Sequence, residues 1–181
     1  MMKIIKASKT DIEALANLLA EGFTHDPLYC HYIPYEEERQ GILVQIFRKI
    51  LTDFWEELTV FTTPEKAGVL CICPHFAQGE ERVFLPAEVQ KVYERICAGT
   101  VDQFYQEYLI LDLLAVRPEM RGKGLARALV EEFRREVARR GLPGVVEIYE
   151  PANVEFYEKL GFRLAHVQPV GETLSAYLLE I

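Results

Sequence analysis

The sequence has few cysteines, and they fit neither a disulfide framework nor a common zinc-binding pattern. The four are Cys30, Cys71, Cys73 and Cys97. They form no C-x-x-C pair, and the run from Cys71 to His75 (C-I-C-P-H) has no partner pair elsewhere in the chain. We therefore expect no metal site, and we interpret Cys71 and Cys73 as small buried residues of a strand that ends at Pro74.

The sequence also lacks a long apolar run and an excess of basic residues. Because it has no apolar stretch of membrane-spanning length and no signal peptide, we expect a cytoplasmic protein without a membrane partner. The 28 aspartates and glutamates outnumber the 20 lysines and arginines, and the resulting net charge of −8 argues against nucleic-acid binding. The negative charge would modestly favour the approach of a cationic substrate, although solubility alone also explains it.

No internal repeat and no low-complexity linker divides the chain. Its 181 residues, 50% hydrophobic and 27% charged, are typical of one globular domain that spans residues 1–181. The element order that we predict is βααββαβαβαββ, which favours one mixed α/β sheet.

Helix and strand signals place these elements along the chain. Thr10 and Glu13 are predicted to form a capping box before the first helix, which Gly22 is expected to end. Asp26 is predicted to cap a one-turn helix at 27–32. A longer helix follows from the glutamates at 36–38, with Ile42, Ile46, Ile50 and Phe54 at helical spacing. Further strands are predicted at 1–7, 57–63, 67–73, 108–116, 145–149, 162–168 and 174–181, helices at 121–140 and 153–160, a loop at 78–82, and a helical stretch from Pro86 to Gly99.

The join between the apolar strand at 109–116 and the helix after it is the strongest functional signal. It reads R-G-K-G-L-A over residues 121–126. The first N–H groups of a helix are unpaired and the helix dipole is positive there, so such an end binds phosphates readily. Gly122 and Gly124 would permit close approach of a diphosphate, and the two basic residues add donors. Rossmann and Walker patterns are absent, and an ordinary tight turn is the alternative.

The segment 121–126 resembles the acyl-CoA pyrophosphate loop of the GNAT superfamily of N-acetyltransferases. Arg121, Gly124 and Ala126 fill the family's Q/R-x-x-G-x-G/A motif. Downstream, residues 153–162 are similar to the family's N-x-x-x-Y-x-x-x-G-F segment. The resemblance implies the GNAT (acyl-CoA N-acyltransferase) fold, an α/β fold with a mixed central sheet of about seven strands flanked by helices.

The same resemblance implies a function and a set of site residues. It implies an acetyltransferase that uses acetyl-CoA and moves the acetyl group to a primary amine of a small molecule or peptide by direct attack. In the family the Asn of the second motif contacts the pantetheine arm and the Tyr lies beside the thioester. The cofactor-binding residues implied are Leu114, Ala115, Val116, Arg121, Gly122, Lys123, Gly124, Leu125, Ala126, Asn153 and Tyr157. The aromatic-rich segment 23–35 either forms a wall of the acceptor site, as in the family, or simply covers the core.

The chemistry of amine acetylation calls for a base and for an acid. An alkyl ammonium with a pKa of about 10.4 is almost fully protonated at pH 7, so a group must accept its proton. The candidates are Asp112, Glu107, Glu147 and Glu150, then His25 and His31, or a water chain. We favour Asp112, which lies in an apolar run where an unpaired acid is costly, and Glu147, although a structural hydrogen bond would also explain Asp112.

Tyr157 is the predicted acid, because its hydroxyl would donate a hydrogen bond to the departing thiolate. Its spacing from Asn153 places both residues on one side of a helix. The alternative is a core aromatic residue beside Phe156. Backbone N–H groups near Leu114 and Val116 would stabilise negative charge on the acetyl oxygen if the central strands diverge there.

Two other functions stay open at this stage. One is a non-catalytic CoA-binding sensor or interaction module with the GNAT fold, and the other is a nucleotide-phosphate binder that uses only residues 121–126. The sequence identifies no particular acceptor, and it leaves a homodimer open.

Overall fold

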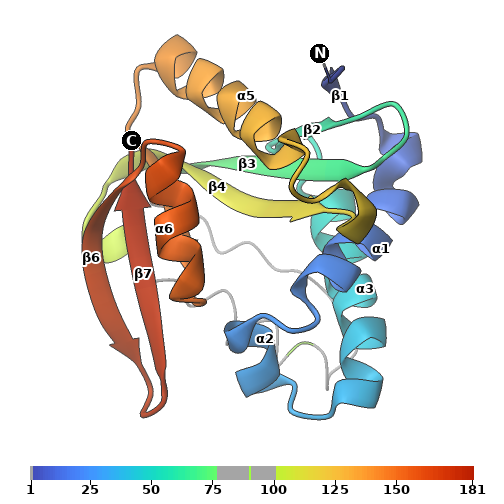
Figure 1. Ribbon diagram of the computed structural model, residues 1–181, viewed down its shortest axis with the longest axis horizontal. Helices are drawn as coiled ribbons and strands as arrows, with labels where there is room; N and C mark the ends of the chain where they lie inside the picture. The colour runs from blue at the N-terminus through green and yellow to red at the C-terminus, as the bar shows by residue number, and fades with distance from the viewer. Residues whose placement is uncertain (1, 77–89, 91–100) are drawn as a thin grey trace.

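The computed structural model describes residues 2–76, 90 and 101–181, and its strands form one seven-stranded sheet in the order β1-β2-β3-β4-β5-β7-β6 (Figure 1). β4 and β5 pair in parallel, whereas every other neighbouring pair is antiparallel. The predicted mixed sheet is therefore confirmed. The strands are β1 (Ile5–Lys6), β2 (Thr59–Thr62), β3 (Gly68–Phe76), β4 (Glu107–Val116), β5 (Gly144–Ile148), β6 (Arg163–Val170) and β7 (Leu174–Glu180).

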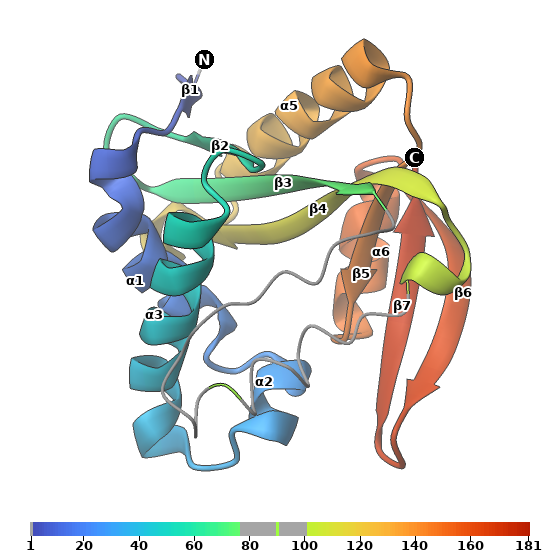
Figure 2. The same ribbon diagram turned by 180° about the vertical axis from the view of Figure 1, so that it is seen from behind.

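Helices cover both faces of this sheet. α5 and α6 pack on one face, and α1 and α3 pack on the other (Figures 1 and 2). The helices are α1 (Ile12–Phe23), α2 (Pro27–Tyr32), α3 (Glu36–Asp53), α5 (Leu125–Arg140) and α6 (Ala152–Lys159), with 3-10 turns η1 (Lys9–Asp11), η2 (Val101–Gln103) and η3 (Pro118–Met120). Within the described part of the chain, no helix combines the length and the apolar character needed to span a membrane. The predicted loop at 78–82, the predicted helical stretch from Pro86 to Gly99, and Cys97 lie outside the described residues.

A β-bulge in β4 shifts the alternation of its side chains, so that residues before and after the bulge point to opposite faces of the sheet. Leu111 pairs with Ile72 and Leu113 pairs with Cys71, so Asp112 is an extra residue with no partner in β3. Leu111 consequently packs on the α5 and α6 side, whereas Leu113 packs on the α1 and α3 side. In a regular strand two residues this far apart would point to the same face.

The start of the first helix differs from the prediction. The capping box is formed by Ser8 and Asp11, whose carboxylate accepts the Ser8 backbone N–H at 2.9 Å, and not by Thr10 and Glu13. η1 precedes α1, so the helical turn begins earlier than the apolar period suggested. Gly22 does not end α1, which continues to Phe23.

Gly22 instead lets α1 approach the central strand. A Cβ atom at this position would lie 2.8 Å from the Cβ of Ala115 in β4. Close backbone approach, and not helix termination, therefore explains the glycine.

The helix of the central join also begins later than predicted. α5 starts at Leu125 and not at Arg121, because Gly122 (φ 72°) and Gly124 (φ 85°) both adopt left-handed backbone conformations. Residues 121–124 are thus a loop that leads into the helix. Its other end agrees with the prediction, since Gly141 is the left-handed C-cap.

Candidate functional site

The parallel pairing between β4 and β5 stops after a short distance. Only Leu109 with Gly144 and Ile110 with Val145 are paired, although β4 continues to Val116. Beyond this point the two strands turn away from each other (Figure 2). Among the described residues, the second half of β4 therefore has β3 on one side and no paired strand on the other. We call this unpaired side of β4 the opening.

The backbone groups that face this opening follow from hydrogen bonds at the end of β4. The Arg117 N–H donates to Ala67 O at 2.9 Å, on the β3 side. Since strand residues alternate, Leu114 and Val116 direct their backbone groups to the open side. By the same alternation, Ala115 directs its backbone groups towards β3, as Arg117 does. The Nε atom of Arg121 donates to Val116 O at 3.2 Å, which agrees with this orientation.

The loop at 121–124 lies directly after this open edge and leads into α5. Arg121 and Lys123 are exposed, and a Cβ atom added to Gly122 or Gly124 would meet nothing within 4 Å. Gly124 is the N-cap of α5, with no side-chain cap and no acid in the first turn of the helix. An uncapped, acid-free helix start beside two cations, with free space over two glycines, is suited to bind phosphate groups.

Two arginines of α5 bond to the C-terminal end of α6. Arg127 Nη2 donates to Lys159 O at 3.4 Å, and Arg134 Nη2 donates to Leu160 O. Asn153 is exposed in the first turn of α6, and Tyr157 is buried one turn later. The two sequence motifs are therefore carried by helices that are tied together.

Tyr157 is both a core residue and part of the candidate site. Its ring packs edge-on against Phe156 and Phe162, with ring centroids 5.1 and 5.3 Å away. Burial raises the pKa of the Tyr157 hydroxyl, and the charge of Asp26 raises it further. The hydroxyl is consequently protonated at neutral pH, as a hydrogen-bond donor to a developing anion must be.

Asp112, the extra residue of the β4 bulge, lies at the open edge. Its side chain is accessible to solvent and yet surrounded by protein, and this desolvation, followed by the charge of Glu147, raises its pKa to about 6. It has no ion-pair partner among the described residues. An accessible carboxyl with these surroundings is the environment expected at the floor of a cleft and in many proton-transfer sites.

Glu147, on β5, is the acid whose charge acts on Asp112. Its side chain is half-buried and accepts a hydrogen bond from the hydroxyl of Tyr149. The other predicted base candidates lie in less suitable places. Glu107 is exposed at the start of β4, and the Glu150 carboxylate accepts the Ala152 N–H at 3.1 Å.

The two histidine candidates are exposed side chains of the α2 region. His25 Nδ1 lies 4.0 Å from Glu36 Oε1, and the ring of His31 packs edge-on against Tyr32. Among the described residues, neither histidine forms an ion pair or ring contact with Asp112, Glu147 or Tyr157, so the structure does not bring them together with the other candidates.

Asp26 belongs to the same region, although sequence reasoning assigned it only a capping role. As predicted, its carboxylate caps α2 by accepting the Leu28 N–H at 2.9 Å. Burial, and then the charge of Glu150, raise its pKa to about 6, and Asp26 in turn acts on Tyr157 and Tyr149. The Asp-Pro pair gave a clear capping signal, but the proximity to α6 and β5 depends on the tertiary fold.

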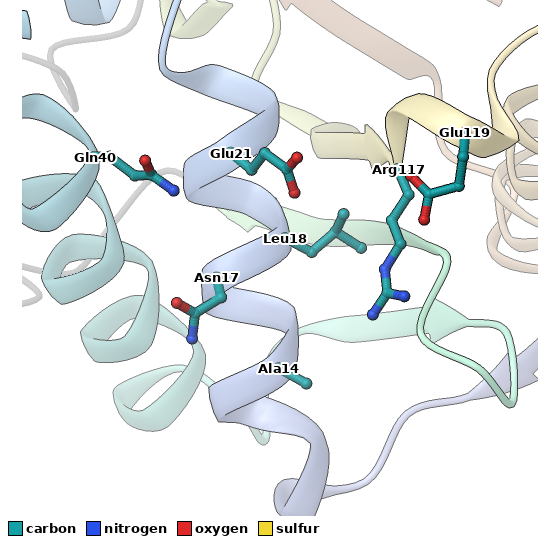
Figure 3. Close-up of a pocket in the computed structure, with 7 residues that line it drawn as sticks. All are labelled: Ala14, Asn17, Leu18, Glu21, Gln40, Arg117 and Glu119. Carbon is teal, nitrogen blue, oxygen red and sulfur yellow. The ribbon is translucent and has the colours of Figure 1, made fainter.

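A cavity of about 340 Å³ lies between α1, α3 and the segment that follows β4. Figure 3 shows Arg117 and Glu119 beside α1 on one flank and Gln40 of α3 on the other. Leu18 and Glu21 of α1 also line it. None of the predicted site residues lines it, although Arg117 and Glu119 lie between Val116 and Arg121 in the chain.

The cysteines give no sign of a metal centre where they are described. Cys71 is buried, whereas Cys30 and Cys73 are half-buried and donate hydrogen bonds to Thr24 O and Pro74 O. Across residues 2–76, 90 and 101–181, no group of three histidine, cysteine or acidic side chains is arranged to hold a metal ion.

Comparison with known proteins gives a family match and a set of similar folds. A family model described as an acetyltransferase (GNAT) domain matches residues 80–164. No curated protein sequence matches the chain. An N-acetyltransferase from Staphylococcus aureus Mu50 has 17% identical residues and a TM-score of 0.69, and the match covers 99% of this chain and 100% of that one.

Two further structures share the fold over nearly their full lengths. Agmatine N-acetyltransferase has 13% identity and a TM-score of 0.63, with 99% of this chain and 98% of that chain covered. The NatC complex bound to Gag peptide and CoA has 15% identity and a TM-score of 0.58, with the same shares covered. At these identities the likeness concerns the fold.

Proposed function

We propose that this chain is a member of the GNAT superfamily of acetyltransferases and that it transfers an acetyl group from acetyl-CoA to a primary amine of a small molecule or peptide by direct attack. The observation that carries the proposal is the open edge of β4, which runs directly into the glycine loop at 121–124. An extended, thioester-bearing ligand with a diphosphate needs both features, side by side.

The residues present fit CoA. Gly122 and Gly124 leave free space over the loop, and the first N–H groups of α5 with Arg121 and Lys123 would hold the diphosphate. Leu114 and Val116 would offer backbone groups to the pantetheine arm, and Asn153 would contact it from α6. Ala115 would take part only as the residue between them. Leu125 and Ala126 would contribute through their N–H groups.

Acetyl-CoA supplies the activated acetyl group when it is bound. This chain's own residues then have three tasks, namely to orient the amine, to accept its proton and to stabilise negative charge. The free N–H groups of Leu114 and Val116 are suited to the third task, since fixed backbone donors need no reorganisation as charge develops.

Asp112 and Glu147 are suited to accept the proton of the amine. Two neighbouring carboxyl groups lie at the opening, and Asp112 has a pKa of about 6. Such a base is ionised at pH 7, and its pKa is still close to the pH at which it would act. We expect turnover to rise with pH and to reach half of its plateau near pH 6. The Asp112→Asn variant should lose this rising limb together with much of its turnover.

Tyr157 would donate a hydrogen bond to the departing thiolate. Its raised pKa makes complete proton transfer from the phenol unfavourable, so we assign it charge stabilisation, with solvent completing the protonation.

A small cationic amine is the acceptor class that the charges favour. Asp26, Asp112, Glu147 and Glu150 come from three different elements, and among the described residues no basic side chain contributes to the pKa of Asp26 or Asp112. One protein of the same fold is an agmatine N-acetyltransferase, and another was solved with a peptide and CoA, so amines of both kinds belong in the test.

The decisive experiment is a calorimetric titration of acetyl-CoA and CoA into the purified chain, with Gly124→Val as the test variant. A side chain at this left-handed position would occupy the space over the loop. Loss of two charge-assisted hydrogen bonds at about 1.5 kcal/mol each predicts affinity weaker by about a hundredfold. Turnover with agmatine, phenylethylamine and a peptide with a free N-terminus then tests the acceptor class.

Gly171→Val is the matched control. Gly171 (φ 66°) lies in the turn between β6 and β7, also with nothing within 4 Å of an added Cβ atom. Both variants therefore carry similar backbone strain, of about 1–2 kcal/mol, but only one faces the proposed diphosphate. Equal CoA affinity in the two variants would refute the loop assignment. CoA binding without acetylation of any amine would favour the non-catalytic alternative.

A further inference from the structure

Arg39 is a buried cation on the apolar face of α3. Only 5% of its surface is exposed, and it shares this face with Leu43 and Phe47. A buried guanidinium is costly unless its donors are paired. The partners of Arg39 are three backbone carbonyl groups, with no carboxylate among the described residues.

The three carbonyls belong to the two ends of α2. Arg39 Nη1 donates to Thr24 O at 2.8 Å, before α2, while Nε donates to Ile33 O at 2.7 Å and Nη2 to Pro34 O at 3.2 Å, after it. Thr24 is the C-cap of α1 and Ile33 is the C-cap of α2. Carbonyls at helix C-termini lack partners within the helix and lie at the negative end of its dipole, so a guanidinium suits both.

The segment between these two ends faces the candidate site. α2 packs against β7 as well as α3. It begins at Asp26, whose charge raises the pKa of Tyr157, and Tyr32 at its other end raises the pKa of Tyr149. The position of α2 therefore sets the distance between Asp26 and the groups on α6 and β5.

We propose that Arg39 is a positioning residue, which sets the acceptor affinity of the site by fixing both ends of α2. The proposal rests on the proposed function, because it takes α2 as a wall of the acceptor site. Arg39 itself has no described contact with Asp26, Asp112, Glu147 or Tyr157, nor with the loop at 121–124. It acts on the acceptor only through the helix that it holds.

The test compares two variants of Arg39 with a control on the same helix. Arg39→Met keeps much of the side-chain volume but leaves the three carbonyl groups without donors. Arg39→Lys retains the charge, and its ammonium group can donate to some of the three carbonyl groups. Arg48→Met is the control, because Arg48 is exposed on α3 and bonds to Glu13 of α1 at 2.6 and 2.7 Å, without touching α2.

Steady-state kinetics with acetyl-CoA and agmatine or phenylethylamine separates positioning from general damage. We expect Arg39→Met to raise the KM for the amine at least tenfold, while the KM for acetyl-CoA changes less than twofold. Arg39→Lys should lie between Arg39→Met and the unmodified chain, and Arg48→Met should leave both constants unchanged. A parallel loss of affinity for amine and acetyl-CoA, or an unchanged KM for the amine, would overturn the proposal.

Hydrogen exchange provides a readout that needs no acceptor. The amides of Cys30 and Ile33 bond to Asp26 O and Tyr29 O at 2.9 and 2.8 Å. We expect both to exchange at least tenfold faster in Arg39→Met, with amides of α5 unchanged. If they exchange at the original rate, Arg39 does not hold α2 and the proposal fails. A chain that binds acetyl-CoA but acetylates no amine contradicts the proposed function instead, and the exchange data still decide the role of Arg39.

Discussion

At the residue scale, Tyr157 is a core residue to which the proposed function also assigns a role. Its ring is part of the cluster on the α5 and α6 face of the sheet, and it packs between Phe156 and Phe162. Its hydroxyl is held in the neutral form by burial and by Asp26, which raise its pKa. Burial of Tyr157 in the core is thus compatible with the role that we propose for its hydroxyl.

The Tyr157→Phe variant separates these two roles, because it removes only the hydroxyl and keeps the ring. We expect turnover to fall by about 10²-fold, the lower end of the range for a positioned acid, with CoA affinity unchanged within a factor of two. Rapid kinetics and calorimetry on the same preparation measure both quantities. Tyr35→Phe, at a residue 71% exposed, is the control and should keep full turnover. Unmodified turnover in Tyr157→Phe would remove its role in charge stabilisation.

At the element scale, the packing of α1 on β4 depends on a single missing side chain. Gly22 and Gly41 are both exposed helical glycines, in α1 and α3, but their surroundings differ. An added Cβ atom would lie 2.8 Å from the Ala115 Cβ atom at Gly22 and would meet nothing within 4 Å at Gly41. The same substitution should therefore have opposite effects in the two helices.

We predict that Gly41→Ala stabilises the protein and that Gly22→Ala destabilises it. Alanine in a helix interior is favoured over glycine by about 0.5–1 kcal/mol, so Gly41→Ala should raise the Tm by about 1–4 °C. At Gly22 the overlap with β4 should outweigh this gain, since overpacking costs about 1–3 kcal/mol. Calorimetric unfolding of both variants provides the measurement. A Tm that rises equally in both would show that α1 can move away from β4 at no cost.

The elements also show which parts of the fold local sequence signals can predict. The cap of α2 by Asp26 and the left-handed glycine after α5 agree with prediction because each depends on residues close together in the chain. The boundaries of two strands differ, since β1 is only Ile5–Lys6 and β3 continues past Pro74 to Phe76. The bulge at Asp112 was not predicted, since one extra residue in an apolar run changes no local signal. It is recognisable only from the pairing with β3.

Arg39 shows a second limit of sequence analysis. The apolar face of α3 was predicted from Ile42, Ile46, Ile50 and Phe54, yet the fully buried face is rotated towards Leu43 and Phe47 and includes Arg39. Its burial is explained by carbonyls of residues 24, 33 and 34, which no periodicity reveals. The roles assigned to Tyr157, Asp112, Glu147 and the cofactor-binding residues stay predictions, which the variants above address.

At the scale of the whole molecule, Asp26 and Asp112 make stability depend on pH. Both carboxyl groups have a pKa of about 6 in the folded chain, against about 3.9 when unfolded. The folded state therefore binds these protons more tightly. The resulting contribution to stability is fully present below about pH 4 and is lost as the pH rises through 6.

We predict that the Tm of the unmodified chain falls, relative to an Asp26→Asn/Asp112→Asn double variant, between pH 4 and pH 7. Asparagine is as good an N-cap as aspartate, so the double variant keeps α2 capped. Carboxylates whose pKa is lowered, such as Asp11 and Glu136, act in both proteins and cancel in the difference. Thermal unfolding at closely spaced pH values gives the curve. A constant difference would show that the two carboxyl groups are solvated as in water.

The opening between β4 and β5 also differs from the outer edges of the sheet as a place where another chain could add a strand. A free strand edge ordinarily invites another chain to add a strand, and so promotes aggregation. Here the unpaired part of β4 belongs to a central strand of the sheet. The space between β4 and β5 closes at Ile110 and Val145, where the two strands pair. The true edges are β1, with only two residues, and β6, which contains Pro169 and an exposed Arg163. The chain can thus keep a row of backbone donors free for a ligand without offering a long, regular edge to a second molecule.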